Sequence, residues 1–454
     1  MFDTILRNGT VVDPLDGVRP ADLALRDGKI AAIMEPGAPA EAHDVLDVSG
    51  KHLFPGVIEP HTHIGFLNPF QADVTTETAS AAIGGVTTVF SFHRHYQSAE
   101  PKPYDDFPEL VETINAGAYV DVAIHLGMLT EVQASQIEKY IEWGVSSFKF
   151  YMAYRGEDGK TVGMINEIDD GVMFDAFSVL GKYPHAVACV HCENTEIIGR
   201  RARQVKAAGR ADLAAWNAAR PSFAEAEHVR RAGYFAEIAG CNLYYVHIGA
   251  AKSVEEAILQ KARYDRITIE TCPHYLTLTE DSELGPVAKV NPPVRAQADL
   301  DRIWQALLDG DIETVGTDHC AMPRTKKAGD IWKASPGFPG MATMLPVMLH
   351  EGYHRRGMGL QHIARALSYN AAKSFNLLPH KGALQVGFDA DIAVVDLELE
   401  KRVNPALLLS SSDFSLQEGQ VLKGWPVSTF LRGKVVARDG AILGRPGDGR
   451  YLAR

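Results

Sequence analysis

The stretch VIEPHTHIG, positions 57 to 65, places His61 and His63 two residues apart at the end of an apolar run. In a β-strand, residues i and i+2 point to the same side, so both imidazoles would face one space. Two neutral imidazoles that converge on one point can bind a metal ion. A pair of hydrogen-bonded histidines at a strand end is the alternative, and this stretch alone leaves both interpretations open.

Later apolar runs carry further polar side chains: Lys149 in SFKFYM, His191 in AVACVH, His247 in LYYVHIG and Asp318 in ETVGTDH. With the first two histidines they form a set of nitrogen and oxygen donors that suits zinc, with manganese, iron or cobalt as alternatives. A metal dication would repel a charged ammonium, and lysine has no lone pair until it loses its proton. Lys149 has apolar and aromatic neighbours, so a lowered pKa would let its amine react with carbon dioxide. The resulting carbamate could bridge two metals.

The elements that must position these residues alternate regularly. From position 54 to about 320, eight apolar runs are separated by helical stretches. The expected strands are 54–61, 86–92, 120–126, 147–152, 186–191, 243–249, 267–273 and 313–319. Eight successive β-then-α units favour a closed parallel (β/α)8 TIM barrel, whose chemistry lies at the C-terminal ends of its strands. A doubly wound open sheet is the alternative, but no GxGxxG follows the first strand.

Both ends of the chain differ from this middle part. They contain short strand-like runs separated by turns such as Asn8-Gly9 and Asp27-Gly28. This pattern predicts a small β-sandwich domain formed by both termini. Its two segments, 1–53 and 381–454, precede and follow a barrel at 54–380 in the sequence. Within the barrel, Ser222 and Glu225 have the spacing of a capping box that opens a helix.

Composition excludes several classes of function. The net charge of −12 disfavours binding to nucleic acid or to an anionic membrane surface. No apolar run reaches roughly 18 residues, which predicts no transmembrane helix, and the first residues lack the pattern of a signal peptide. The few cysteines lie mostly in or beside apolar runs and predict reduced thiols in a cytoplasmic protein. The expected partners are a small-molecule substrate and further copies of the chain, as a dimer or tetramer.

Six motifs, PGVIEPHTH, GVSSFKFYMAY, CVHCEN, VHIG, ETCPHYLTLT and VGTDHC, occur in this order. Their order resembles the cyclic amidohydrolases, and most closely the hydantoinase and dihydropyrimidinase branch. The resemblance extends through nearly the whole chain, including KGALQVGFDADIAVVD near position 390. It implies a binuclear metal centre with two ligand sets, His61, His63 and Asp318 for one ion and His191 and His247 for the other. A carboxylated Lys149 and a hydroxide would bridge the ions, and Asp318 would also be the general base.

The resemblance also implies a reaction, the hydrolysis of a hydantoin or dihydropyrimidine ring to an N-carbamoyl amino acid. Tyr154, five residues after Lys149, resembles the tyrosine that in this branch hydrogen-bonds the substrate and the developing oxyanion. Packing of the loop is the alternative for Tyr154. Asn291, in KVNPPVR, lies where this branch usually has a serine that contacts the ring amide, and either residue can hydrogen-bond an amide.

Other activities stay open. In the dihydroorotase-like pattern an arginine two residues after the second metal histidine holds a substrate carboxylate, but His63 is followed by Ile64-Gly65. The next loop contains Phe66, Leu67 and Phe70, which predict an apolar or absent ring substituent. Alternatively, these three residues pack against a neighbouring loop or subunit. An allantoinase or another cyclic-ureide hydrolase is a second enzyme alternative. A non-catalytic scaffold is disfavoured because all six ligand positions are filled.

A few residues depart from the family pattern or have no place in it. Glu59 replaces the usual aspartate, and we expect it to orient an imidazole. His93 and His95, at the end of the second strand, have no ligand role, although either could reach the substrate. No role is expected for His125 or His274.

Overall fold

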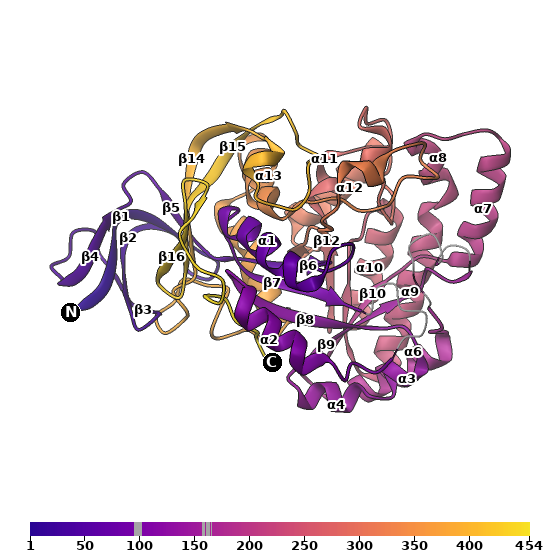
Figure 1. Ribbon diagram of the computed structural model, residues 1–454, viewed down its shortest axis with the longest axis horizontal. Coiled ribbons are helices and arrows are strands. Elements are labelled where there is room, and N and C mark those ends of the chain that lie inside the picture. The colour runs from indigo at the N-terminus through magenta and orange to yellow at the C-terminus, as the bar shows by residue number, and fades with distance from the viewer. Residues whose placement is uncertain (95–101, 157–158, 160–163, 165) are drawn as a thin grey trace.

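The computed structural model describes residues 1–94, 102–156, 159, 164 and 166–454. They form two β-sheets that contain strands from different parts of the chain (Figure 1). One sheet is parallel and contains the middle of the chain. The other is mixed and contains strands from both ends, which lie side by side as the indigo and yellow ribbons.

The parallel sheet has eight strands in sequence order within the described residues. They are β6 (Val57–Thr62), β7 (Val86–His93), β8 (Asp121–Met128), β9 (Ser147–Tyr151), β10 (Val187–His191), β11 (Asn242–Tyr245), β12 (Ile267–Thr271) and β13 (Thr314–Val315). A parallel bridge between Thr62 and His319 joins the first strand to the segment after the last. The predicted (β/α)8 barrel is therefore confirmed.

Helices cover the outside of the barrel (Figure 1). The α-helices are α1 (Phe70–Ile83), α2 (Phe107–Gly117), α3 (Glu131–Ala134), α4 (Ile137–Glu142), α6 (Asp170–Leu180), α7 (Thr195–Ala207), α8 (Leu213–Ala219), α9 (Ser222–Ala239), α10 (Ala251–Arg263), α11 (Pro273–Thr277), α12 (Gln297–Asp309), α13 (Met344–Val347), α14 (Leu360–Ala364) and α15 (Asn370–Ser374). Shorter 3-10 or π segments are η1 (Gly285–Ala288), η2 (Arg324–Lys327), η3 (Met341–Thr343), η4 (Met348–His354), η5 (Arg365–Tyr369) and η6 (Pro405–Leu407). None of the described helices is both long and apolar enough to span a bilayer.

The mixed sheet combines both ends of the chain, as predicted. Its strands are β1 (Phe2–Asp13), β2 (Gly17–Arg26), β3 (Lys29–Met34), β4 (Ala42–Asp47), β5 (His52–Pro55), β14 (Ile392–Arg402), β15 (Val421–Leu431), β16 (Lys434–Arg438) and β17 (Ala441–Ile442). Strand β5 pairs with β1 on one side and β14 on the other. The first and last parts of the chain therefore share one hydrogen-bonded sheet.

The strand expected at 54–61 is two strands in different sheets. Strand β5 ends at Pro55 and β6 begins at Val57, so Gly56 is the point where the chain passes from the mixed sheet to the barrel. A Cβ at Gly56 would lie 2.2 Å from the Thr87 hydroxyl oxygen. The close approach of β7 therefore requires glycine at this crossing.

A buried charge cluster links the two sheets at the end of the barrel where β8 begins. The Lys381 ammonium lies 2.8 Å from Asp121 Oδ2 and 3.4 Å from Asp389 Oδ2, and it also donates to Asp391. The three carboxylates outweigh the effect of burial and raise the pKa of Lys381. Arg432 of the mixed sheet adds a second cation on Asp121.

The capping-box prediction is wrong. Helix α9 begins at Ser222 after Pro221, and the Ser222 side chain makes no capping hydrogen bond. Glu225 instead points inward, where it accepts hydrogen bonds from the Gly249 N–H and from Arg295. The Glu225 carboxylate therefore bonds to residues distant in the sequence and not to the N-terminus of its own helix.

Candidate metal centre and substrate cavity

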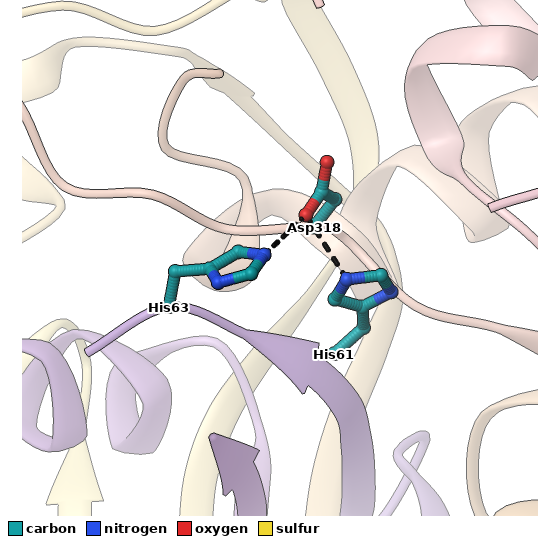
Figure 2. A group of neighbouring side chains, drawn as sticks. All are labelled: His61, His63 and Asp318. Carbon is teal, nitrogen blue, oxygen red and sulfur yellow. Dashed lines mark hydrogen bonds and ion pairs between the residues drawn. The ribbon is translucent and has the colours of Figure 1, made fainter. Parts of the chain in front are cut away.

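His61, His63 and Asp318 converge on one point at the C-terminal end of the barrel (Figure 2). The Nε2 atoms of His61 and His63 lie 3.0 and 2.9 Å from Asp318 Oδ1. Their candidate ligand atoms all lie within 4.8 Å of one another. His61 belongs to β6 and His63 follows it, whereas Asp318 lies three residues beyond β13 with φ of 53°. The predicted first ligand set therefore meets in space.

The donor atoms in this group fit a divalent cation. Among the residues that the structure describes, His61 Nε2 is buried and has no hydrogen-bond partner, although Asp318 Oδ1 lies 3.0 Å away. The other ring nitrogen, Nδ1, lies 2.7 Å from Glu270 Oε1, so in the neutral ring Nδ1 carries the proton and Nε2 carries the lone pair. Burial opposes protonation of His61, but Glu270 and Asp318 outweigh it and raise its pKa to about 9. With its pKa raised, the metal-free ring also carries a proton on Nε2, and a cation that binds at Nε2 would displace this second proton.

Asp318 is held as an anion. Burial disfavours its charge, but His61 and His63 outweigh that effect and hold its pKa well below the usual range. Burial lowers the pKa of His63 to about 4, so that its ring is neutral at physiological pH. Neutral imidazole and ionised carboxylate are the protonation states that metal ligation requires.

The second predicted pair lies next to the first. The His247 ring centroid is 5.2 Å from that of His61 and 4.6 Å from that of His191. Burial lowers the pKa of both histidines. His191 Nε2 lies 2.9 Å from Glu193 Oε2, so its Nδ1 carries the lone pair. Arg220 in turn binds Glu193 at 2.6 Å and keeps that carboxylate ionised.

Lys149 lies in the middle of β9 with 1% of its surface exposed. Its Nζ atom is 4.4 Å from the Phe92 ring centroid and 5.2 Å from that of Tyr151. Burial lowers the pKa of Lys149 to about 8, although Asp318 and other anions raise it. A substantial neutral fraction at neutral to alkaline pH is what carbamate formation needs.

Two buried glutamates, Glu59 and Glu270, make hydrogen bonds around the candidate ligands. Only Glu59 was singled out in the sequence, where we expected it to orient an imidazole. Glu59 makes no hydrogen bond to an imidazole ring within the described residues. Its Oε1 accepts hydrogen bonds from the backbone N–H groups of His61 and Thr317, at 2.9 and 3.0 Å. Glu270, which was not predicted, orients the His61 ring and accepts from the His247 N–H at 2.8 Å.

One cavity of about 550 Å³, open mouth included, has five of the six predicted ligands in its wall: His63, Lys149, His191, His247 and Asp318. His61 is fully buried behind them. Tyr154 and Asn291, the predicted substrate contacts, line the same cavity. Asn291 Oδ1 is buried without a hydrogen-bond partner within the described residues. The Tyr154 ring centroid lies 4.9 Å from that of His191.

Three of the other histidines considered from the sequence, His93, His125 and His274, lie within the described part of the barrel near the site. His125 contacts Ser147 and the Pro60 carbonyl, and His274 packs against Tyr275 and Phe338. His93 is half-buried, with its ring edge-on to Phe70, and does not line the cavity. His95 lies outside the described residues. Arg94, between the two, does line the cavity, and sequence reasoning did not single it out.

A parallel eight-stranded barrel with a histidine, lysine and aspartate cluster at the C-terminal ends of its strands defines a class of hydrolase. The model of the Amidohydrolase family matches residues 173–436, and the chain belongs to this family. It is a hydantoinase-like cyclic amidohydrolase.

Relatives with that character match the whole chain. An L-hydantoinase from Paenarthrobacter aurescens is 34% identical over 100% of this chain and 98% of its own length. An allantoinase from Escherichia coli O1:K1 is 32% identical over 96% of this chain and 95% of its own. The solved L-hydantoinase (dihydropyrimidinase) from Arthrobacter aurescens superposes with a TM-score of 0.93, at 33% identity and with both chains fully covered.

Proposed function

We propose that this hydrolase opens the cyclic amide bond of a hydantoin or dihydropyrimidine ring and releases an N-carbamoyl amino acid. The observation that carries the proposal is the convergence of the candidate ligands on a cavity that also contains Tyr154 and Asn291. Relatives named hydantoinase, similar over the full chain, support the same assignment.

The residues fit a binuclear centre. We assign His61, His63 and Asp318 to one divalent ion and His191 and His247 to the other, with zinc as first choice and manganese, iron or cobalt as alternatives. We assign Lys149 as an N6-carboxylated ligand shared by both ions. When bound, such ions lower the pKa of water and polarise a carbonyl. The lowered pKa of Lys149 supports its assignment.

The protein residues then divide the remaining work. Asp318, ionised and at the cavity wall, accepts a proton from the attacking water and returns it to the ring nitrogen as the amide bond breaks. Tyr154 donates to the carbonyl oxygen as negative charge develops there. Asn291 presents a buried amide to the ring, where its oxygen accepts from a ring N–H.

Allantoin, a hydantoin that carries a ureido group, defines the second candidate reaction. The specific support is the full-length similarity to proteins named allantoinase. Both reactions hydrolyse a cyclic ureide, and the same ligands would serve either. The two reactions differ in the substituent that the substrate ring carries.

We further propose that the enzyme works in the cytoplasm as a homo-oligomer, a dimer or tetramer. All five cysteines are free and buried, which supports a reducing compartment. Light scattering on the zinc-loaded protein tests the assembly.

A substrate panel tests the proposed activity. Zinc-loaded enzyme is incubated with hydantoin, 5-substituted hydantoins, dihydrouracil, dihydroorotate and allantoin, and N-carbamoyl products are quantified. Opening of hydantoins or dihydrouracil is expected, and Asp318→Asn should lower kcat by at least about 100-fold, because base and ligand are lost together. Exclusive turnover of allantoin would favour the second candidate. No turnover of any ring by protein with full metal content would refute both.

A further inference from the structure

A buried arginine lies in the wall of the cavity and has no part in the reaction proposed above. Arg94 directly follows β7, at the C-terminal end of the second barrel strand. Only 5% of its surface is exposed, and it lines the cavity together with the candidate ligands and Tyr154. In a (β/α)8 barrel the active site lies at this end of the strands.

Two aromatic rings position the Arg94 guanidinium. Its Cζ atom lies 5.6 Å from the Phe66 ring centroid and 5.9 Å from that of Tyr151. Tyr151 also contacts Lys149, whose Nζ is 5.2 Å from the same centroid. Cation–π contacts of this kind hold a guanidinium within an apolar wall. The Arg94 guanidinium therefore contacts the Tyr151 ring, which also contacts Lys149, one of the candidate metal ligands.

We propose that Arg94 binds a carboxylate carried by the substrate ring. The inference rests on the proposed function and narrows it. The substrate is a hydantoin or dihydropyrimidine with an acidic substituent, and the product is the N-carbamoyl derivative of an acidic amino acid. A planar guanidinium matches a carboxylate with two parallel hydrogen bonds, and these strengthen in a buried site. Asn291 would hold the ring amide while Arg94 holds the substituent.

This assignment revises the substituent predicted from sequence. That prediction relied on Phe66, Leu67 and Phe70, but of these only Phe66 lines the described cavity, and it does so beside Arg94. Leu67 and Phe70 pack against the hydrophobic core. An alkyl group placed against a buried guanidinium offers it no hydrogen bond, whereas a carboxylate does. The loop after the first strand contains no cation, but Arg94, directly after the second strand, provides one.

The test compares substituents of similar size and different charge on the zinc-loaded enzyme. The substrates are 5-(carboxymethyl)hydantoin, its neutral amide 5-(carbamoylmethyl)hydantoin, and 5-propylhydantoin. Wild type should prefer the acid over the amide by at least about tenfold in kcat/KM. Arg94→Met should lower kcat/KM for the acid by about 100-fold and for the neutral rings by less than about threefold. Arg94→Lys should recover part of the loss, because it keeps the charge without the planar fork.

Met164→Leu is the matched control, since Met164 lines the same cavity but is neither charged nor one of the two rings that position Arg94. It should affect the three substrates to similar extents. Circular dichroism and zinc content establish that each variant is folded. A second measurement needs no variant: N-carbamoyl-aspartate should bind the wild-type enzyme at least about tenfold more tightly than N-carbamoyl-asparagine in calorimetry.

Failure of the inference on Arg94 can be distinguished from failure of the proposed function. If wild type opens neutral hydantoins and Arg94→Met lowers activity on the acid and the amide equally, the inference on Arg94 is overturned and the proposed function stands. Equal binding of the two N-carbamoyl products overturns it as well. If the zinc-loaded wild type opens none of the rings, the proposed function itself fails.

Discussion

Lys327 offers a test of how this fold tolerates a buried amine away from the metal centre. Its side chain is almost fully buried, and Nζ donates to the carbonyl oxygens of Lys289 and Ser335 at 3.1 and 2.8 Å. The Phe338 ring centroid lies 5.4 Å away. Burial lowers the pKa of Lys327 from 10.5 to about 7, with a smaller contribution from the Lys289 cation. We expect Lys327→Met to change the pH dependence of stability.

The sign follows from proton linkage. Between pH 7 and 10.5 the unfolded chain binds a proton at this lysine and the folded chain does not, so stability rises with pH. The difference in pKa corresponds to about 5 kcal/mol, which is the penalty for the buried charge at low pH. Methionine removes that penalty but leaves the Ser335 carbonyl without its hydrogen bond, at a cost of about 1–3 kcal/mol. The variant should therefore be more stable below pH 7 and less stable near pH 10.

Urea unfolding followed by tryptophan fluorescence at pH 7, 8 and 9 measures the effect. Stability of wild type relative to Lys327→Met should increase by about 2 kcal/mol from pH 7 to pH 9. Lys326→Met is the matched control, because Lys326 is the exposed neighbour and its replacement should leave the pH dependence unchanged. A constant gap between wild type and Lys327→Met across this range would refute the reasoning.

Three other substitutions test the centre and the joint between the sheets. Glu270→Gln should weaken zinc binding by about 10- to 100-fold in a chelator competition, because the acceptor of the His61 ring loses its negative charge; unchanged affinity would contradict the role. Lys149→Ala should lose metal and activity, and short carboxylic acids should restore part of both; full metal content with normal turnover would exclude the carbamate. Lys381→Met should destabilise the protein by about 3 kcal/mol in urea, whereas Lys434→Met on the exposed β16 edge should not.

The barrel could be predicted because its strands are apolar runs of similar length in regular alternation with helices. The boundaries depend on contacts that the runs do not reveal. Strand β11 ends at Tyr245 and β13 at Val315, so His247 and Asp318 lie in the following loops rather than in strands. Both residues have positive φ, 41° and 53°, which takes the backbone out of the extended conformation. Nothing local in LYYVHIG or ETVGTDH specifies that turn.

The residues around the site were harder to predict than the candidate ligands. Glu270 lies inside an apolar strand run, and a carboxylate there must have buried partners. Its partners are the His61 ring from β6, the Tyr244 hydroxyl from β11 and the His247 N–H from the loop after β11. Only the folded barrel brings them to Glu270. Arg94 lies between two histidines that drew attention to metal chemistry. Its role depends on Phe66, from the loop after β6, and on Tyr151, from β9.

Closure of the barrel and assembly of the site use the same hydrogen bonds. Glu59 joins the His61 N–H of the first strand to the Thr317 N–H, next to Asp318. Glu270 joins the His61 ring to the His247 N–H. A left-handed conformation at a non-glycine residue costs about 1–3 kcal/mol, and both His247 and Asp318 adopt it. The two buried carboxylates offset that cost where the ligands turn inward, so a substitution at either glutamate should loosen the barrel and displace a metal ligand together.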